Sequence, residues 1–193
     1  MHSCAVYADP VRRLLLAHKE RGALRLAGPL GAVLAGAVNS ALAETDTRPP
    51  QGVLLVPVPS ARRAVRARGH DPMLRLARCA ARELSRAGLP CQVGPALRPS
   101  RGVADQAGLG AAARHRNLHG ALAVPRALRP RLAGRQIILV DDLVTTGASL
   151  AEAARALAAA GAPPLAAATV AATARRAVGG RLPRAVHRRR QPG

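Results

Sequence analysis

The hydrophobic pattern of the chain alternates short apolar runs with longer segments in which apolar residues recur every three or four positions. Runs of the first kind predict strands at residues 53–56, 90–97, 122–124, 137–140 and 165–173. The runs at 53–56 and 137–140 are wholly apolar, which is typical of parallel strands that are buried on both faces. We therefore expect these two strands in the interior of a sheet.

Helical spacing of apolar residues occurs at residues 11–18, 30–44, 73–87 and 150–157. Asp9-Pro10 is a start signal, in which Asp caps a helix and Pro takes its first position, and Asp71-Pro72 starts the helix at 73–87. In the first helix, the three leucines at 14–16 are expected to form the buried face. Alternation of strands and helices predicts an α/β fold, with a mainly parallel twisted sheet flanked by helices and a site at its carboxyl edge.

The length of 193 residues suits one domain, which we place at residues 1–173. Residues 174–193 are basic and poor in apolar side chains, so we expect a disordered tail. The apolar stretch at 26–42 is interrupted by Pro29 and Asn39 and falls short of the roughly 20 residues that cross a bilayer. It is predicted to be a buried helix, and no membrane partner is expected.

Cysteine usage and the N-terminus bear on the cellular compartment. Cys4, Cys79 and Cys91 are too few and too far apart for a disulfide framework or a CxxC metal site. The N-terminus lacks a basic segment followed by an apolar run of adequate length, so no signal peptide is visible. The expected location is the cytoplasm.

The charge balance is strongly basic, with 30 Lys and Arg against 10 Asp and Glu and a formal net charge of +20. Such a charge favours phosphate substrates, nucleic acid or acidic protein surfaces as partners. Arginine has replaced lysine almost everywhere, however, so charge by itself is weak evidence. Tyr7 is the only aromatic residue, and the chain lacks the side chains on which single-stranded nucleic acids usually stack.

The segment at 136–149 combines a strand, an acidic pair, a small hydroxyl-rich loop and a helix start. Thr145, Thr146 and Ser149 offer hydroxyl donors, Gly147 lets a ligand approach the backbone, and the helix N-terminus favours an anion. The carboxylates at 141–142 would repel a phosphate, so we expect them to accept hydrogen bonds from vicinal ribose hydroxyls. These features together predict a site for a sugar phosphate.

Two of these residues also have plainer interpretations. In the plainer interpretation, Asp142 is the first residue of an ordinary loop and Ser149 is only a helix N-cap. Lys19, the only lysine, is either a compact cation placed to contact an anion or a solvated lysine at a helix end.

At this point the sequence resembles a known family. Residues 137–149 match, position by position, the phosphoribosyl diphosphate (PRPP) binding motif of the type I phosphoribosyltransferases. Further similarity to the competence-associated ComF branch of that family lies at residues 18–20, 56–60, 68–71 and 105–109, and at Arg114 and Asn117. The resemblance covers residues 7–173, but the four-cysteine zinc module that ComF proteins often carry is not in this sequence.

The resemblance implies a type I phosphoribosyltransferase fold with a flexible lid loop at about residues 98–110. It implies catalytic roles for Asp141 and Asp142. It also implies a set of substrate-binding residues: Leu143, Val144, Thr145, Thr146, Gly147, Ala148, Ser149, Pro57, Val58, Pro59, Arg63, Arg68, Lys19 and Gln106. Mg²⁺ is expected to be bound through PRPP, with no metal ligands from the protein.

The resemblance also implies a pyrophosphate loop that Pro57 and Pro59 stiffen. Ser60 is expected to cap the short helix after it, which bears Arg62 and Arg63. The plainer alternative is a rigid connection with exposed arginines. His70 is expected to pack or cap rather than to act as an acid or base.

The implied function is transfer of a phosphoribosyl group from PRPP to an acceptor, with release of pyrophosphate. The alternative is a PRPP-sensing or DNA-uptake accessory protein that keeps the fold without turnover. Expected partners are PRPP, nucleic acid through the basic tail, and a second copy of the chain in a homodimer.

Overall fold

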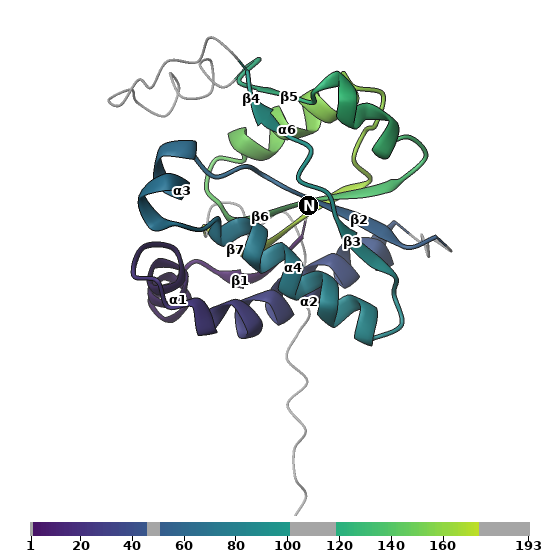
Figure 1. The fold of residues 1–193 in the computed structure, drawn as a ribbon. Coiled ribbons are helices and arrows are strands. Elements are labelled where there is room, and N and C mark those ends of the chain that lie inside the picture. The colour runs from purple at the N-terminus through teal and green to yellow at the C-terminus, as the bar shows by residue number, and fades with distance from the viewer. Residues whose placement is uncertain (1, 46–50, 101–118, 174–193) are drawn as a thin grey trace, which may run out of the picture.

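The computed structural model describes residues 2–45, 51–100 and 119–173 (Figure 1). Seven strands are found there: β1 (His2–Val6), β2 (Val53–Pro57), β3 (Cys91–Val93), β4 (Arg98–Pro99), β5 (Leu122–Ala123), β6 (Gln136–Val144) and β7 (Ala166–Ala172). The α-helices are α1 (Asp9–Glu20), α2 (Ala27–Glu44), α3 (Arg62–Arg68), α4 (Pro72–Arg86) and α6 (Ala148–Ala158). Two 3₁₀ helices, η1 (Leu24–Leu26) and η2 (Arg126–Arg131), complete the described elements.

The main sheet has five strands in the order β1-β7-β6-β2-β3, and every pairing in it is parallel. The central strand β6 runs beside β2 from Val53↔Gln136 to Pro57↔Val140. The short strands β4 and β5 form a separate antiparallel pair. The predicted α/β class and mainly parallel sheet are confirmed.

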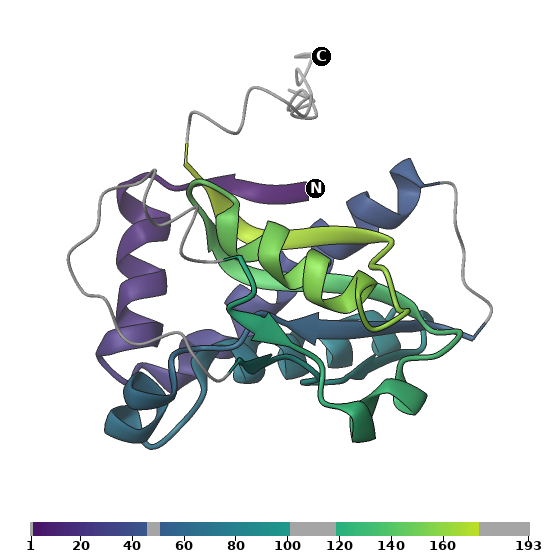
Figure 2. The ribbon, with the colours of Figure 1, turned by 90° about the horizontal axis from the view of Figure 1, so that it is seen from above.

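Helices cover both faces of this sheet, with α2 and α4 on one side and α6 on the other (Figure 1). Side chains of β6 alternate between the two layers. Ile138 and Val140 join the core under α2 and α4, whereas Ile137 and Leu139 join the core under α6. All four are buried, as expected for a strand inside a parallel sheet. Figure 2 shows α1 and α3 together at one end of the sheet.

The predicted buried helix at 30–44 is confirmed and begins three residues earlier, at Ala27. By length and composition alone, the segment Leu24–Glu44 is apolar enough to cross a membrane. In this fold half of its most apolar window is buried, and Ala37, Val38 and Ala41 have no exposed surface. Its apolar residues pack against α4 and β7, which is the ordinary reason for such a composition in a core helix.

The first helix differs from the prediction in its cap and in its buried face. α1 includes Asp9, and Ala8 is the N-cap without a side-chain hydrogen bond. Leu15 is buried, but 43% of Leu14 is exposed. Three successive helical residues spread over about 200° of the helix surface at 3.6 residues per turn, so one buried stripe cannot hold all of them.

Several other boundaries also change. β6 does not stop before the acidic pair but continues to Val144, because β7 keeps pairing with it as far as Ala172. The strand expected at 90–97 is reduced to Cys91–Val93. The sequence pattern did not predict β1, which is short and joins the sheet only through β7.

Candidate functional site

The acidic pair lies near the carboxyl end of β6, the middle strand of the main sheet. Asp141 still pairs with Thr169 of β7, so the neighbouring strand holds the backbone of the pair in place. After Val144 the chain turns through Thr145 and Thr146 into Gly147, which caps α6 with a left-handed φ of 79°. Carboxyl ends of parallel strands followed by helix N-termini are the usual place for ligands in α/β folds.

The loop encloses a small pocket of about 30 Å³. Its lining combines the acidic strand end with the predicted motif: Asp141, Leu143, Val144, Thr145, Thr146, Gly147, Ala148, Ser149 and Leu150. Thr145, Thr146 and Ser149 are exposed, and the Thr146 hydroxyl accepts a hydrogen bond from the Ala148 N–H at 3.3 Å. The positive end of the α6 macrodipole faces this loop, so the pocket favours an anion.

Lys19 reaches the acidic pair from the end of α1. Its Nζ donates a hydrogen bond to the Asp142 Oδ2 at 2.8 Å, although the two residues are 123 positions apart. Desolvation alone would lower the pKa of Lys19, but the attraction of Asp142, then of Asp141 and Glu20, raises it above its usual value. Lys19 is thus paired with a carboxylate of the protein, and its predicted contact with the substrate stays a prediction.

Asp141 has a different environment from its neighbour. Its Oδ1 accepts a hydrogen bond from the Asp142 N–H at 2.9 Å, and its side chain lines the loop pocket. Burial, followed by the repulsion of the Asp142 charge, raises the pKa of Asp141 to about 8, with Lys19 opposing the shift. One carboxylate of the pair is therefore paired with a cation, while the other holds its proton more tightly than an ordinary carboxyl group.

The predicted pyrophosphate loop lies against the same strand end. Pro57 is the residue of β2 opposite Val140, and the Val58 N–H donates to the Val140 carbonyl oxygen at 2.9 Å. Val58 is buried, so this residue presents its backbone rather than its side chain to a ligand. Ser60 does not cap α3 as predicted. Its hydroxyl donates instead to Asp71 Oδ1 at 3.0 Å, and the same oxygen accepts from the Leu74 N–H at the start of α4.

Arg63 and Arg68, which were predicted to bind the substrate, both lie in α3. Arg63 is exposed on this helix. Arg68 ends the helix and holds the Glu20 carboxylate through two hydrogen bonds from Nη2, at 2.7 and 2.8 Å. The last two residues of α1 therefore link α3 and β6, since Lys19 binds Asp142 while Glu20 binds Arg68. Gln106 and the remainder of the predicted lid after Ser100 lie outside the described residues, as does the tail at 174–193.

Sequence reasoning missed one buried polar cluster beside the loop. Glu152 of α6 is 5% exposed, and its carboxylate accepts hydrogen bonds from the Leu122 N–H and from Arg155. Arg155 also donates to the Leu122 carbonyl oxygen at 3.0 Å, so the pair fastens β5 to α6. The only signal in the sequence was a single acidic residue in an alanine-rich helix, and a pair three positions apart usually lies on the surface.

Comparison with known proteins agrees with this geometry. A family model described as a phosphoribosyl transferase domain matches residues 101–185. The matched segment contains β5, β6, the following loop, α6 and β7, and thus the acidic strand end and the pocket. No curated protein matches the chain. The family match supports the type I phosphoribosyltransferase family, and the parallel five-stranded sheet is consistent with the fold of that family.

Proposed function

We propose that the protein binds PRPP at the carboxyl end of β6 and transfers its phosphoribosyl group to an acceptor nucleophile. One observation carries the proposal. A lysine-paired aspartate and a second, partly buried aspartate adjoin a loop that opens onto the N-terminus of α6. This arrangement offers acceptors for sugar hydroxyls next to donors for a phosphate, and the match to the phosphoribosyl transferase domain supports PRPP as the substrate.

In this reaction the bond between ribose C1′ and the pyrophosphate oxygen breaks, and a new bond forms from C1′ to the acceptor. Pyrophosphate leaves with the electron pair, and positive charge develops on the sugar ring. Asp142, which is paired with Lys19, and Asp141, which gives up its proton more readily as positive charge develops beside it, stabilise that charge while they hold the ribose hydroxyls. The loop from Thr145 to Ser149 binds the 5′-phosphate through hydroxyls and backbone N–H groups.

Departure of the negatively charged pyrophosphate requires nearby cations that stabilise it. Within the described residues, no three His, Cys, Asp or Glu side chains are grouped so that they hold a metal ion by themselves. Mg²⁺ is commonly bound through substrate phosphates, and it would enter this site with PRPP and neutralise the pyrophosphate. Arg63 and Arg68 lie on the helix that follows the loop after β2, and we assign them to the same end of the substrate.

The ComF branch is the finer assignment that we propose. It is supported by the segments at 18–20 and 68–71, because the structure brings them together through the pair formed by Glu20 and Arg68. A cytoplasmic location and a homodimer accompany this assignment as proposals.

Calorimetric titration of PRPP with Mg²⁺ tests the binding step, and Asp142→Asn is the informative variant. Loss of charge-assisted hydrogen bonds worth about 1.5–3 kcal/mol should weaken PRPP binding by roughly 10- to 150-fold. Asp9→Asn, which removes an exposed carboxylate from α1, should bind PRPP as the wild-type protein does. Unchanged affinity in a folded Asp142→Asn variant would exclude the acidic pair from the site.

Turnover needs a separate assay, in which pyrophosphate release is followed with nitrogen bases and amines as acceptors. Release that depends on both PRPP and one acceptor class would establish the transferase. Tight PRPP binding without release would favour the alternative, a protein that senses PRPP without turnover.

A further inference from the structure

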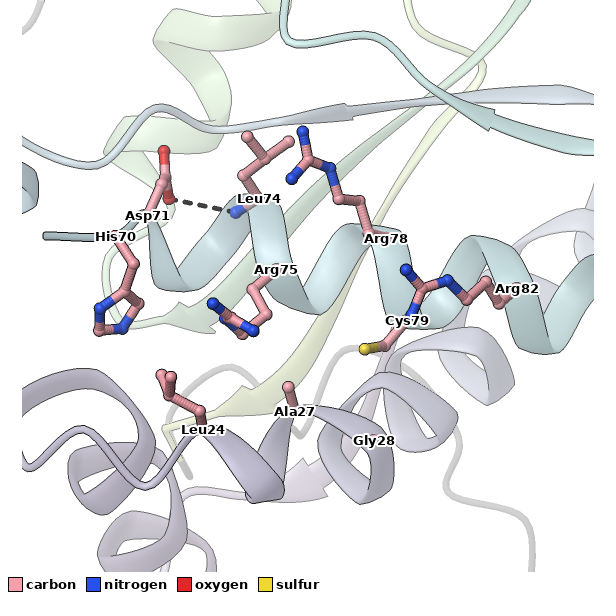
Figure 3. Close-up of a pocket in the computed structure, with 10 residues that line it drawn as sticks. All are labelled: Leu24, Ala27, Gly28, His70, Asp71, Leu74, Arg75, Arg78, Cys79 and Arg82. Atoms are coloured by element: carbon pink, nitrogen blue, oxygen red, sulfur yellow. Dashed lines mark hydrogen bonds between the residues drawn. The ribbon is translucent and has the colours of Figure 1, made fainter.

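A second pocket, of about 390 Å³, lies between α4 and the segment that leads into α2 (Figure 3). It is lined by Leu24, Ala27, Gly28, His70, Asp71, Leu74, Arg75, Arg78, Cys79 and Arg82. None of these residues lines the pocket at the loop after β6. The second pocket is therefore a separate feature, and the proposed transfer reaction does not use it.

The lining is strongly cationic. Arg75, Arg78 and Arg82 follow one another along two turns of α4, and none of them forms an ion pair with any residue that the structure describes. Asp71 is the one carboxylate in the lining, and its Oδ1 already accepts hydrogen bonds from the Leu74 N–H and the Ser60 hydroxyl. The pocket is thus bordered by three arginines and a single, already engaged carboxylate, and in Figure 3 the Arg75 side chain points toward α2 whereas that of Arg78 points away from it.

Two nitrogen atoms at this pocket are buried and lack a hydrogen-bond partner among the described residues, namely Arg75 Nε and His70 Nε2. Arg75 Nε always carries a hydrogen, so this donor is unsatisfied, which is costly in a buried position. His70 Nδ1 must donate to the Arg68 carbonyl oxygen at 3.0 Å, because a carbonyl only accepts. In the neutral ring Nε2 is then an acceptor, which suits a hydroxyl group of the ligand or a protonated phosphate oxygen.

We propose that this pocket is a second anion site, which binds the phosphate group of a small phosphorylated molecule. A phosphate dianion presents several acceptor oxygens and suits a cluster of guanidinium groups, which bind it by paired hydrogen bonds. In Figure 3 the side chains of Arg75 and His70 both point toward Leu24, at the α2 side of the pocket. The apolar residues Leu24, Ala27 and Leu74 leave a surface for the organic part of the ligand.

The position of the unsatisfied atoms favours a small ligand over a polymer. Solvent does not reach Arg75 Nε or His70 Nε2, so a chain lying across the surface does not contact them. Both residues line the cavity, so only a ligand small enough to enter it comes near these atoms. Nucleic acid, in contrast, needs only the outer arginines and would bind through charge alone.

Cys79 provides a local probe of occupancy in the full-length protein. It lines the pocket and is half-buried, whereas Cys4 is exposed and Cys91 lies in β3. We would measure the rate of alkylation of each cysteine by peptide mass spectrometry, with inorganic phosphate as the probe and chloride at matched ionic strength as the reference. Saturable slowing at Cys79 alone, absent with chloride, is the expected result.

The variant Arg75→Gln/Arg82→Gln should raise the phosphate concentration that half-protects Cys79 by at least about tenfold, the effect of losing one charge-assisted hydrogen bond. The control Arg126→Gln/Arg129→Gln removes the same charge from exposed positions in η2 and should leave protection unchanged. The proposal is overturned if phosphate and chloride slow Cys79 equally, or if both double variants weaken protection to the same degree. Circular dichroism of both variants confirms that they are folded before the comparison is made.

Discussion

Lys19 Nζ and Asp142 Oδ2 lie 2.8 Å apart and join the end of α1 to the end of β6. Asp142 is 8% exposed, so without Lys19 its carboxylate would be a buried charge with no cation beside it. A carboxylate has about four acceptor positions, and one lysine leaves room for ribose hydroxyls on the others. The contact therefore prepares Asp142 as an ionised acceptor before the substrate arrives.

A double-mutant cycle measures this coupling. We expect Lys19→Met and Asp142→Asn each to lower the free energy of unfolding, and the pair to lower it by less than the sum. Because 38% of the Lys19 side chain is exposed, solvent screening should limit the coupling energy to about 0.5–1.5 kcal/mol. Urea unfolding at pH 7 provides the four values. Strict additivity would show that the two residues do not interact in solution.

Asp141→Asn should stabilise the protein without ligand while it weakens PRPP binding. The pKa of Asp141 is raised from 3.8 to about 8, so the folded state holds its proton more tightly than the unfolded state. The stability that this provides is fully present below the unfolded pKa and is lost as pH rises through the folded pKa. An amide never ionises, and its oxygen still accepts from the Asp142 N–H.

The increase in the free energy of unfolding caused by Asp141→Asn should therefore grow between pH 5 and pH 8, to on the order of 1–3 kcal/mol. Urea unfolding at both pH values checks this, with Asp9→Asn as a control for loss of an exposed carboxylate. A stability difference that is the same at the two pH values would mean that Asp141 is not held in its protonated form. This exchange of stability for function is common at ligand sites.

Much of the fold was predictable because its elements are encoded locally. The strands β2 and β6 are wholly apolar over four residues, and Asp71-Pro72 marks the start of α4 whatever surrounds it. The Asp71 side chain caps that helix by accepting a hydrogen bond from the Leu74 N–H. Lys19 stood out as the only lysine, but its partner was 123 positions away and no local pattern indicated it.

What the sequence did not predict depends on contacts between distant segments. β1 is defined by its pairing with β7, and β6 extends past the acidic pair because β7 extends beside it. Glu152 resembles a surface residue until β5 covers it. In each case a partner far along the chain decides the outcome, and hydrophobic periodicity carries no information about that partner.

Glu152→Ala should destabilise the protein by about 1–3 kcal/mol. The substitution leaves the Leu122 N–H and the partly exposed Arg155 without their carboxylate, which is the costly way to break a buried pair. Glu83→Ala is the matched control, since Glu83 pairs with Arg86 at the same spacing on an exposed surface and should cost about 0–1 kcal/mol. Equal losses in the two variants, measured by urea unfolding, would contradict the role assigned to Glu152.

The pKa of Glu152 leads to a prediction about stability at acidic pH. Desolvation alone would raise the pKa of Glu152, but hydrogen bonds from Arg155 and from the Leu122 and Gly120 backbone lower it below 4.5. Stability from a lowered carboxyl pKa is present above the unfolded value and is lost as pH falls through the folded value. The cost of Glu152→Ala should therefore shrink as the pH falls below about 4.5.

The packing of α2 on α4 depends on Gly31. A Cβ at this position would lie 2.4 Å from the Cys79 Cβ and 3.1 Å from the Ala80 backbone nitrogen, so the helices approach too closely for any side chain there. Glycine within a helix otherwise costs about 0.5–1 kcal/mol relative to alanine. Its presence at 31 therefore reflects close packing rather than helix formation.

Gly31→Ala should lower the free energy of unfolding by about 1–3 kcal/mol, because overpacking outweighs the gain in helix propensity. Gly28→Ala, in the same helix, meets no heavy atom within 4 Å of the new Cβ and should raise stability by up to about 1 kcal/mol. Urea unfolding of both variants in phosphate-free buffer compares the same chemical change at a packed and an open position. The two changes in the free energy of unfolding should have opposite signs, because a Cβ at position 31 meets α4 whereas a Cβ at position 28 meets no neighbouring atom. A stabilising Gly31→Ala would mean that the two helices lie further apart in solution than the contact between Gly31 and Cys79 requires.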